Sequence, residues 1–410
     1  MAARPPEGET PPTDGALPEP ALTEFRSGTG PFGAYLHIPF CLRRCGYCDF
    51  NTYTPGELGE SGVGTPIEVY LEAIHAEIEL AGRLVPSRPL DTVFLGGGTP
   101  TLLSPSQIGG LLGALEARFG LADGVEVTTE ANPDTVDEAR IAGLAEAGIT
   151  RVSLGMQSAV PHVLATLDRT HEQAAVGRAV RAARAHGLAT SVDLIYGTPG
   201  ESLEDWRRSL HEAVALEPDH VSAYALVVEE GTRLAAQVRR GEVQAPDDDD
   251  EADKYELADS LLTEAGFAWY EVSNWARTAA GVCRHNEGYW RSGQWWGFGP
   301  GAHSHVGGVR WWNVRHPAAY SGRLAAGHSP AQGREVLTAE QRHFEDVLLR
   351  IRLAEGLDLA RVPRVGADVV TALVEDGLVG PVDPAQAGAR LVLTRRGRLL
   401  ADAVVHRLLG

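Results

Sequence analysis

The sequence predicts an α/β protein built as a partial barrel of six β–α units. Short apolar runs alternate with amphipathic stretches of helical period, and this alternation favours right-handed crossovers and a parallel sheet. The expected strands cover residues 34–38, 92–95, 125–129, 151–154, 190–195 and 221–226. The expected helices between them cover residues 68–81, 106–118, 136–147, 172–186 and 203–216. Six units are fewer than a closed α/β barrel has, so we expect the barrel to be open on one side.

Four segments are expected along the chain of 410 residues. Residues 1–30 are rich in Pro, Glu, Thr and Gly, which predicts a disordered tail. Residues 31–265 form the barrel, and residues 266–335 form an aromatic and Gly-rich extension that packs on it. Residues 336–410 form a small helical, winged-helix-like C-terminal domain. An acidic chain without a basic recognition helix favours a lid or docking role for this domain over DNA binding.

The composition excludes several classes of partner. The formal net charge of −19 argues against nucleic acid, because phosphate binding needs a basic face. No apolar run reaches the length of about 18 residues that indicates a membrane helix, so no integral membrane span is expected. The N-terminal residues lack the basic-then-apolar order of a signal peptide, which predicts a cytoplasmic protein.

Three cysteines lie within eight residues, as Cys41, Cys45 and Cys48. They supply one thiolate fewer than a closed four-thiolate site needs, so a [4Fe-4S] cluster bound here keeps one iron open for another ligand. Structural zinc, with His37 as a fourth ligand, is the alternative, but zinc sites usually combine two separated cysteine pairs. The spacing therefore favours the cluster. We interpret the remaining cysteine, Cys283, as an ordinary buried residue, with a redox thiol or a haem thiolate as alternatives.

Unusual residues follow the predicted strands at the ends where α/β barrels bind ligands. A Gly-rich loop with Gly97, Gly98 and Thr99 follows the second strand, and its glycines allow close approach of backbone to a ligand. Polar residues lie at or near the ends of later strands: Glu130, Gln157, Arg169 and Asp193. Carboxylates suit hydroxyl and ammonium groups, and arginine suits a carboxylate, so together they fit a zwitterionic nucleoside. A tight turn for the glycines, and helix caps for the polar residues, are the alternatives.

The order of these segments resembles the radical S-adenosylmethionine (SAM) family. Its landmarks are Tyr35-x-His37-Ile38-Pro39-Phe40-Cys41, GGGTP, Glu130, GMQS, Leu167-Asp168-Arg169 and DLIYGTPG. They are similar to the branch that contains oxygen-independent coproporphyrinogen III oxidase and a haem chaperone, and the similarity extends from about residue 33 to the C-terminus. It implies a radical SAM partial (βα)6 barrel, a [4Fe-4S] cluster on the three cysteines, a reductant for that cluster, and bound SAM. The residues implied to line the SAM site are Tyr35, Tyr47, Gly97, Gly98, Thr99, Glu130, Gln157, Arg169 and Asp193.

Within this branch, position 50 separates the two activities. The oxidases carry a fourth cysteine where this chain has Phe50. The resemblance therefore implies a chaperone that binds haem as cargo and delivers it to haem-accepting proteins, with radical decarboxylation of coproporphyrinogen III as the alternative. Whether the protein is an enzyme stays open. The region 269–312 is dense in aromatic residues and includes His285 and His303, which suits either a macrocycle or an interdomain core, and no haem ligand is identified.

Overall fold

The structure, a computed structural model, describes residues 8–28, 30–59 and 64–410. Its centre is a 12-stranded sheet in the order β12-β11-β10-β9-β1-β2-β3-β4-β5-β6-β8-β7. The six central strands run parallel to one another, which confirms the predicted order. They are β1 Phe32–Ile38, β2 Leu90–Gly97, β3 Leu121–Ala131, β4 Arg151–Gln157, β5 Ala189–Tyr196 and β6 His220–Ala225.

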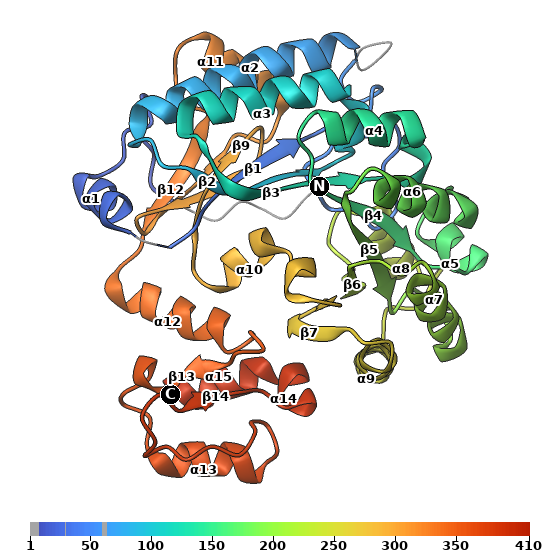
Figure 1. The fold of residues 1–410 in the computed structure, drawn as a ribbon, viewed down its shortest axis with the longest axis vertical. Coiled ribbons are helices and arrows are strands. Elements are labelled where there is room, and N and C mark those ends of the chain that lie inside the picture. Colours follow the sequence, from blue (N-terminus) through green and yellow to red (C-terminus); the bar gives the residue numbers. More distant parts are fainter. Residues whose placement is uncertain (1–7, 29, 60–63) are drawn as a thin grey trace.

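The helices that follow these strands cover the outer side of the curved sheet (Figure 1). The predicted ones are α2 Gly64–Leu84, α3 Pro105–Phe119, α4 Glu138–Glu146, α6 Gln173–Ala185 and α7 Leu203–Ala215. Helix α9 Asp248–Glu264 packs beside α7, whereas α5 Pro161–Thr166 and α8 Arg233–Arg239 contribute Val163 and Leu234 to a separate apolar cluster against Tyr47. Local chemistry explains where several of them begin, because Ser104 and Ser202 form capping boxes with Gln107 and Asp205 at the starts of α3 and α7.

The segment after the barrel extends the sheet at both of its edges. Strand β8 pairs antiparallel with β6, whereas β9 pairs parallel with β1. The added elements are β7 Ala268–Glu271, β8 Asn274–Ala276, α10 Arg284–Trp290, β9 Gln294–Phe298, β10 His303–Val306, β11 Val309–Asn313, α11 Pro317–Ala325 and β12 Ala331–Val336. Its aromatic residues pack on each other, as Trp296 and Trp311 do with ring centroids 4.7 Å apart.

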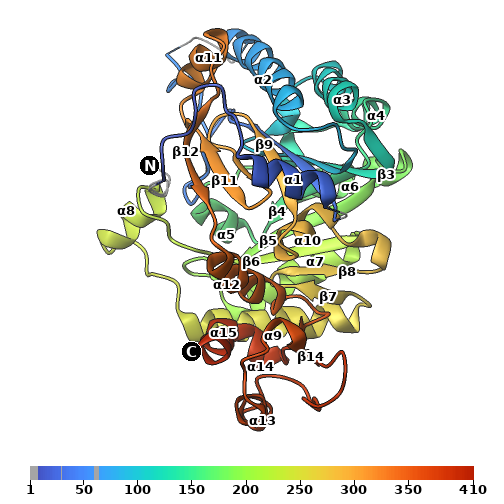
Figure 2. The ribbon, with the colours of Figure 1, turned by 90° about the vertical axis from the view of Figure 1, so that its left-hand side faces the viewer.

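The prediction of a disordered N-terminal tail is wrong for residues 8–28. Helix α1 Glu19–Ser27 buries Ala21 and Phe25 against the barrel, where the Phe25 ring meets Phe32 edge-on at 4.9 Å. Farther upstream, Glu9 forms an antiparallel bridge with Arg334 of β12, and Figure 2 shows the segment beside that strand. Two apolar residues four positions apart form an apolar face on the helix that can be buried. The prediction missed this face because the segment as a whole is polar. Residues 1–7 lie outside the described residues.

The C-terminal segment forms its own small apolar cluster, which includes Val347, Ile351, Leu373 and Val404. Its elements are α12 Ala339–Arg350, β13 Leu357–Asp358, α13 Ala367–Glu375, β14 Arg390–Leu391, α14 Arg395–Leu399 and α15 Ala401–Leu409, with β13 and β14 paired. The winged-helix-like assignment stays a prediction. Within the part of the chain that the structure describes, no helix is long and apolar enough to cross a membrane.

Candidate functional site

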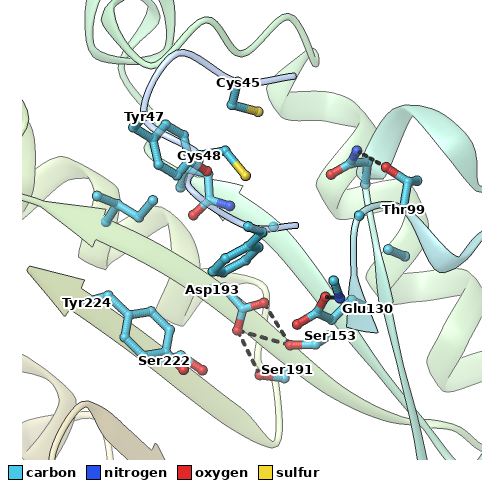
Figure 3. Close-up of a pocket in the computed structure, with 18 of the residues that line it drawn as sticks. Cys45, Tyr47, Cys48, Thr99, Glu130, Ser153, Ser191, Asp193, Ser222 and Tyr224 are labelled. Carbon is cyan, nitrogen blue, oxygen red and sulfur yellow. Dashed lines mark hydrogen bonds between the residues drawn. The ribbon is translucent and has the colours of Figure 1, made fainter. Parts of the chain in front are cut away.

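One cavity of about 480 Å³ brings all the predicted site residues together. It lies inside the open barrel, beneath the loop that follows β1 (Figure 3). The predicted residues that line it are Tyr35, Cys41, Cys45, Tyr47, Cys48, Gly97, Gly98, Thr99, Glu130, Gln157, Arg169 and Asp193. Segments up to about 150 residues apart in the sequence therefore meet around one cavity, because the C-terminal ends of parallel strands lie at the same edge of the sheet.

The cysteine loop connects the end of β1 to a return segment that runs back along it. The Cys41 N–H donates to the Tyr53 carbonyl at 3.1 Å, and the Tyr53 N–H donates to the Pro39 carbonyl at 2.7 Å. The Cys45 and Cys48 side chains border the cavity in Figure 3. Burial raises the pKa of the Cys48 thiol to about 12, so a bound cation is what turns this thiol into a thiolate at neutral pH. Among the described residues, no three His, Cys, Asp or Glu side chains gather as they do around a single metal ion.

His37 and Asn51 hold the two ends of this loop. The His37 Nε2 lies 2.8 Å from the Asn51 carbonyl, and its Nδ1 lies 3.0 Å from the Tyr35 hydroxyl. Burial lowers the pKa of His37 to about 4, so the ring is neutral at pH 7. Both ring nitrogens already have hydrogen-bond partners, which gives His37 a positioning role instead of the ligand role that a zinc site requires. The Asn51 Nδ2 donates to the carbonyls of Pro300 and Arg315 at 2.9 and 2.8 Å.

The Gly-rich loop lines the cavity and also packs directly on the cysteine loop, which gives its glycines a second role beside the expected approach to a ligand. A Cβ on Gly98 would lie 2.4 Å from the Phe40 carbonyl oxygen. The Thr99 N–H donates to that same carbonyl at 2.8 Å. Gly97 has a φ of +106°, and a Cβ there would lie 2.5 Å from the His37 ring. The glycines therefore allow two backbone segments to pack in contact below the cysteines.

The carboxylates of Glu130, on β3, and Asp193, on β5, face each other across the cavity. Burial, together with the charge of Asp193, raises the pKa of Glu130 to about 7, although the Gly97 N–H donates to this carboxylate at 3.0 Å. Burial also raises the pKa of Asp193. The Ser153 hydroxyl lies 3.0 and 2.8 Å from the two Asp193 oxygens, and Ser191 adds a longer contact at 3.4 Å (Figure 3). A cationic ligand between the two carboxylates would relieve their repulsion.

Arg169, in the loop after α5, reaches the part of the cavity beside Cys45. Its Nη1 lies 3.6 Å from the Cys45 sulfur and 2.9 Å from Asn132 Oδ1, and its Nη2 donates to the Gly155 carbonyl at 2.7 Å. Its Nε is buried and has no hydrogen-bond partner among the residues that the structure describes. Gln157 ends β4 with a φ of +62°, a left-handed conformation that is uncommon for a residue with a side chain and that turns the chain at the cavity. Burial raises the pKa of the nearby Tyr47 hydroxyl.

Sequence reasoning missed much of the cavity wall. The additional polar lining residues include Asn132, Arg151, Ser153, Ser191, His220 and Ser222. Except for Asn132 they lie on β4, β5 and β6, where a polar residue within an apolar strand is the signal that points to them. His220 is buried, with its ring nitrogens 2.8 Å from Ser191 Oγ and from the Tyr270 hydroxyl.

The residues whose role the sequence leaves open lie in different parts of the structure. Cys283 is buried at the cavity wall, with its sulfur 3.7 Å from Glu126 Oε1, and His285 lines the same wall. His303 lies on β10 and is exposed, stacked on Trp312. Phe50 stands at the rim of the cavity with 58% of its surface exposed.

Comparison with known proteins places the chain in a family. Residues 35–213 match the radical SAM superfamily model. The chain is 54% identical over 381 residues to the protein named heme chaperone HemW from Mycobacterium tuberculosis strain H37Rv, covering 93% of this chain and 95% of that protein. It is 34% identical to heme chaperone HemW from Escherichia coli K12, covering 93% and 98%.

A solved structure confirms the fold class. The coproporphyrinogen III oxidase HemN from E. coli, described as a radical SAM enzyme, aligns with a TM-score of 0.80 over 97% of this chain and 94% of that chain. At 22% identity this likeness concerns the fold alone. Identity above 50% over nearly the full length of both chains is the stronger relation, and it agrees with the residues gathered at the cavity. The chain therefore belongs to the radical SAM superfamily, within the HemW family.

Proposed function

We propose that this protein is a haem chaperone of the radical SAM type, which binds haem as cargo and passes it to haem-accepting proteins. The observation that carries the proposal is the 54% identity over 93% of the chain to a protein named heme chaperone HemW. Phe50 agrees with it, because an aromatic side chain cannot supply the sulfur that the oxidase pattern has at this position. At a net charge of −19 the chain lacks the excess of basic residues that nucleic-acid binding needs. This agrees with the proposal that its partners are haem and proteins. We place the protein in the cytoplasm, where a reductant is available to the cluster.

The thiols of Cys41, Cys45 and Cys48 are the residues that would hold a [4Fe-4S] cluster. Their chemistry fits, since soft thiolates are the ligands of iron-sulfur clusters and three of them border one cavity. When bound, a cluster of this kind supplies one electron to the sulfonium of SAM. The chain itself contributes the loop geometry, through the hydrogen bonds of His37 and Asn51 that fix both ends of the cysteine segment.

The rest of the cavity fits SAM, which carries a sulfonium, an ammonium and a carboxylate. The facing carboxylates of Glu130 and Asp193 suit its cationic and hydroxyl groups, because ionisation of both is unfavourable until a positive charge lies between them. The free Nε of Arg169 suits its carboxylate. Tyr35, Tyr47, Gly97, Gly98, Thr99 and Gln157 complete the proposed contacts.

Anaerobic incubation with two macrocycles tests the proposal against the oxidase alternative. Reconstituted protein should carry about four iron atoms per chain and no zinc. With haem it should show a shifted Soret band, and with coproporphyrinogen III, SAM and reductant it should release no carbon dioxide. Cys45→Ala should lose the cluster, which separates cluster-dependent effects from simple haem adsorption. Decarboxylation at enzymatic turnover without retained haem would establish the oxidase, and tightly bound zinc would remove the radical SAM chemistry.

A further inference from the structure

Asn132 joins two groups that come from different parts of the barrel. It follows β3 directly, and its side chain lies between Arg169 and Thr99. Its Oδ1 accepts a hydrogen bond from Arg169 Nη1 at 2.9 Å, and its Nδ2 donates to Thr99 Oγ1 at 3.2 Å. The amide orientation is determined, because the reverse arrangement would place an N–H group against the guanidinium, which has only donors.

Each of these two partners reaches a different cysteine. Arg169 Nη1 lies 3.6 Å from the Cys45 sulfur, and Thr99 Oγ1 lies 3.8 Å from the Cys41 sulfur. Thr99 is buried with 3% of its surface exposed, so water does not compete for its hydroxyl. The remaining cysteine is independent of this group, because Cys48 takes its hydrogen bond from the backbone of Phe50.

The directions of the hydrogen bonds follow from the amide. Since Asn132 Nδ2 can only donate to the Thr99 hydroxyl, the single proton of that hydroxyl is left to point at Cys41. Since Asn132 Oδ1 can only accept from Arg169, one Nη1 proton is used there and the second remains for Cys45. One amide thus directs one donor to each of two sulfur atoms, in addition to the Thr52 hydrogen bond that Cys41 also has.

We propose that Asn132 is a positioning residue that sets Arg169 and Thr99 as hydrogen-bond donors to the Cys45 and Cys41 thiolates. The proposal rests on the cysteines binding a cluster, as in the proposed function. Hydrogen bonds to cluster sulfur atoms stabilise the more negative, reduced state and raise the reduction potential. Arg169 thereby has a role at the cysteines in addition to the SAM contact proposed for it.

The midpoint potential of the reconstituted cluster, measured without SAM, tests this proposal. Asn132→Ala should lower the potential, because the Thr99 hydroxyl is then free to turn away from Cys41 and Arg169 is held only by its contact with the Gly155 carbonyl. Asn132→Asp should lower it further, because a carboxylate adds negative charge and accepts the Thr99 proton that would otherwise point at Cys41. Asn286→Ala removes an amide from another wall of the same cavity and should leave the potential unchanged.

A second pair of variants covers the case in which the Asn132 variants do not fold or do not assemble a cluster. Thr99→Val has nearly the same shape but lacks the hydroxyl, so it should lower the potential, whereas Thr99→Ser should restore it. Wild-type potentials in Asn132→Ala and Thr99→Val, each with a full cluster, would overturn the proposal. So would equal potentials of Thr99→Val and Thr99→Ser below the wild-type value. Failure of wild-type protein to assemble any cluster would instead overturn the proposed function.

Discussion

The backbone N–H of Gly98 donates a hydrogen bond to the Ile38 carbonyl at 2.8 Å, at the point where β1 ends and the approach to the cysteines begins. The Gly-rich loop and the cysteine loop are therefore one packed unit, although about fifty residues separate them in the sequence. A change in either loop should alter the other.

Gly98→Ala should impair cluster assembly before it affects anything else. The new Cβ would lie 2.4 Å from the Phe40 carbonyl oxygen, a backbone atom that cannot move without moving Cys41. Iron and sulfide content per chain after reconstitution measures the effect. Gly56→Ala is the matched control, because a Cβ there has no atom of the described residues within 4 Å. Full iron content in Gly98→Ala would show that the two loops move independently.

Asn51→Asp should destabilise the end of the cysteine loop while it keeps the side-chain shape. The substitution places a carboxylate oxygen against the Pro300 and Arg315 carbonyls, which now accept hydrogen bonds at 2.9 and 2.8 Å. Loss of a buried hydrogen bond costs about 1–3 kcal/mol, so thermal stability should fall and iron should leave faster to a chelator.

Tyr53→Phe is a milder change in the same group of contacts and serves as the comparison for Asn51→Asp. It removes only a hydroxyl with 3.3 Å contacts to Asn51 Oδ1 and the Arg315 carbonyl, so its effect on both measurements should be smaller. Equal iron-loss rates for Asn51→Asp and the wild type would show that these contacts do not restrain the loop.

Glu130→Gln should stabilise the ligand-free protein at pH 8 but hardly at pH 5. Burial raises the pKa of Glu130 from its usual 4.5 to about 7, so the folded state holds a proton there that the unfolded state has released. The stability that this proton contributes is complete below pH 4.5 and is lost as the pH rises through 7, by up to roughly 3 kcal/mol. Gln cannot ionise, so the variant avoids that loss.

Melting temperatures of both proteins at several pH values check this prediction, since buried carboxyls other than Asp193, whose charge acts on Glu130, contribute alike to each and cancel in the difference. The same variant should bind SAM more weakly at pH 8, because the negative charge facing Asp193 is gone. A stability difference between the variant and the wild type that does not change with pH would mean that Glu130 does not titrate in this range.

Asp259→Ala should loosen the C-terminal segment from the barrel. This carboxylate, on α9, is 4% exposed and accepts hydrogen bonds from Arg395 at 2.6 Å, from Arg398 at 2.9 Å and from Trp275 Nε1 at 3.1 Å. Because the Arg395 and Arg398 side chains are 42% and 19% exposed, the loss should lie below the cost of about 3–5 kcal/mol for a fully buried pair, and hydrogen exchange in α14 and α15 should accelerate. Asp376→Ala breaks an exposed pair with Arg407, worth about 0–1 kcal/mol, and should change exchange little. Similar exchange in both variants would locate the attachment elsewhere.

The barrel was predictable because its strands and helices follow local rules. Strands such as β1 are buried along almost their whole length, which makes them visible as continuous apolar runs. Strands β7 to β12 were not predicted, because most are short, as β8 is with Asn274–Ala276, and because β8 and β9 join the sheet by pairing with the distant barrel strands β6 and β1. Their order in the sheet depends on long-range pairing that no local pattern reveals.

The candidate site was predictable where a short motif carries the chemistry, as for the cysteines and the Gly-rich loop. The supporting residues were not, because the role of a side chain such as Asn132 depends on what two other loops bring to it. Similarly, the close approach of Gly98 to the Phe40 carbonyl depends on how two distant loops pack, so the sequence does not reveal it.

Lys254 is the only lysine of the chain and its side chain is fully buried, paired with Asp250 and donating to the Glu201 carbonyl at 2.9 Å. The folded protein therefore exposes no lysine amine to acylating reagents. An activated ester reaches the Lys254 amine only when the helix around it opens. Acylation of Lys254 would then report directly on opening of the region where α9 packs on α7.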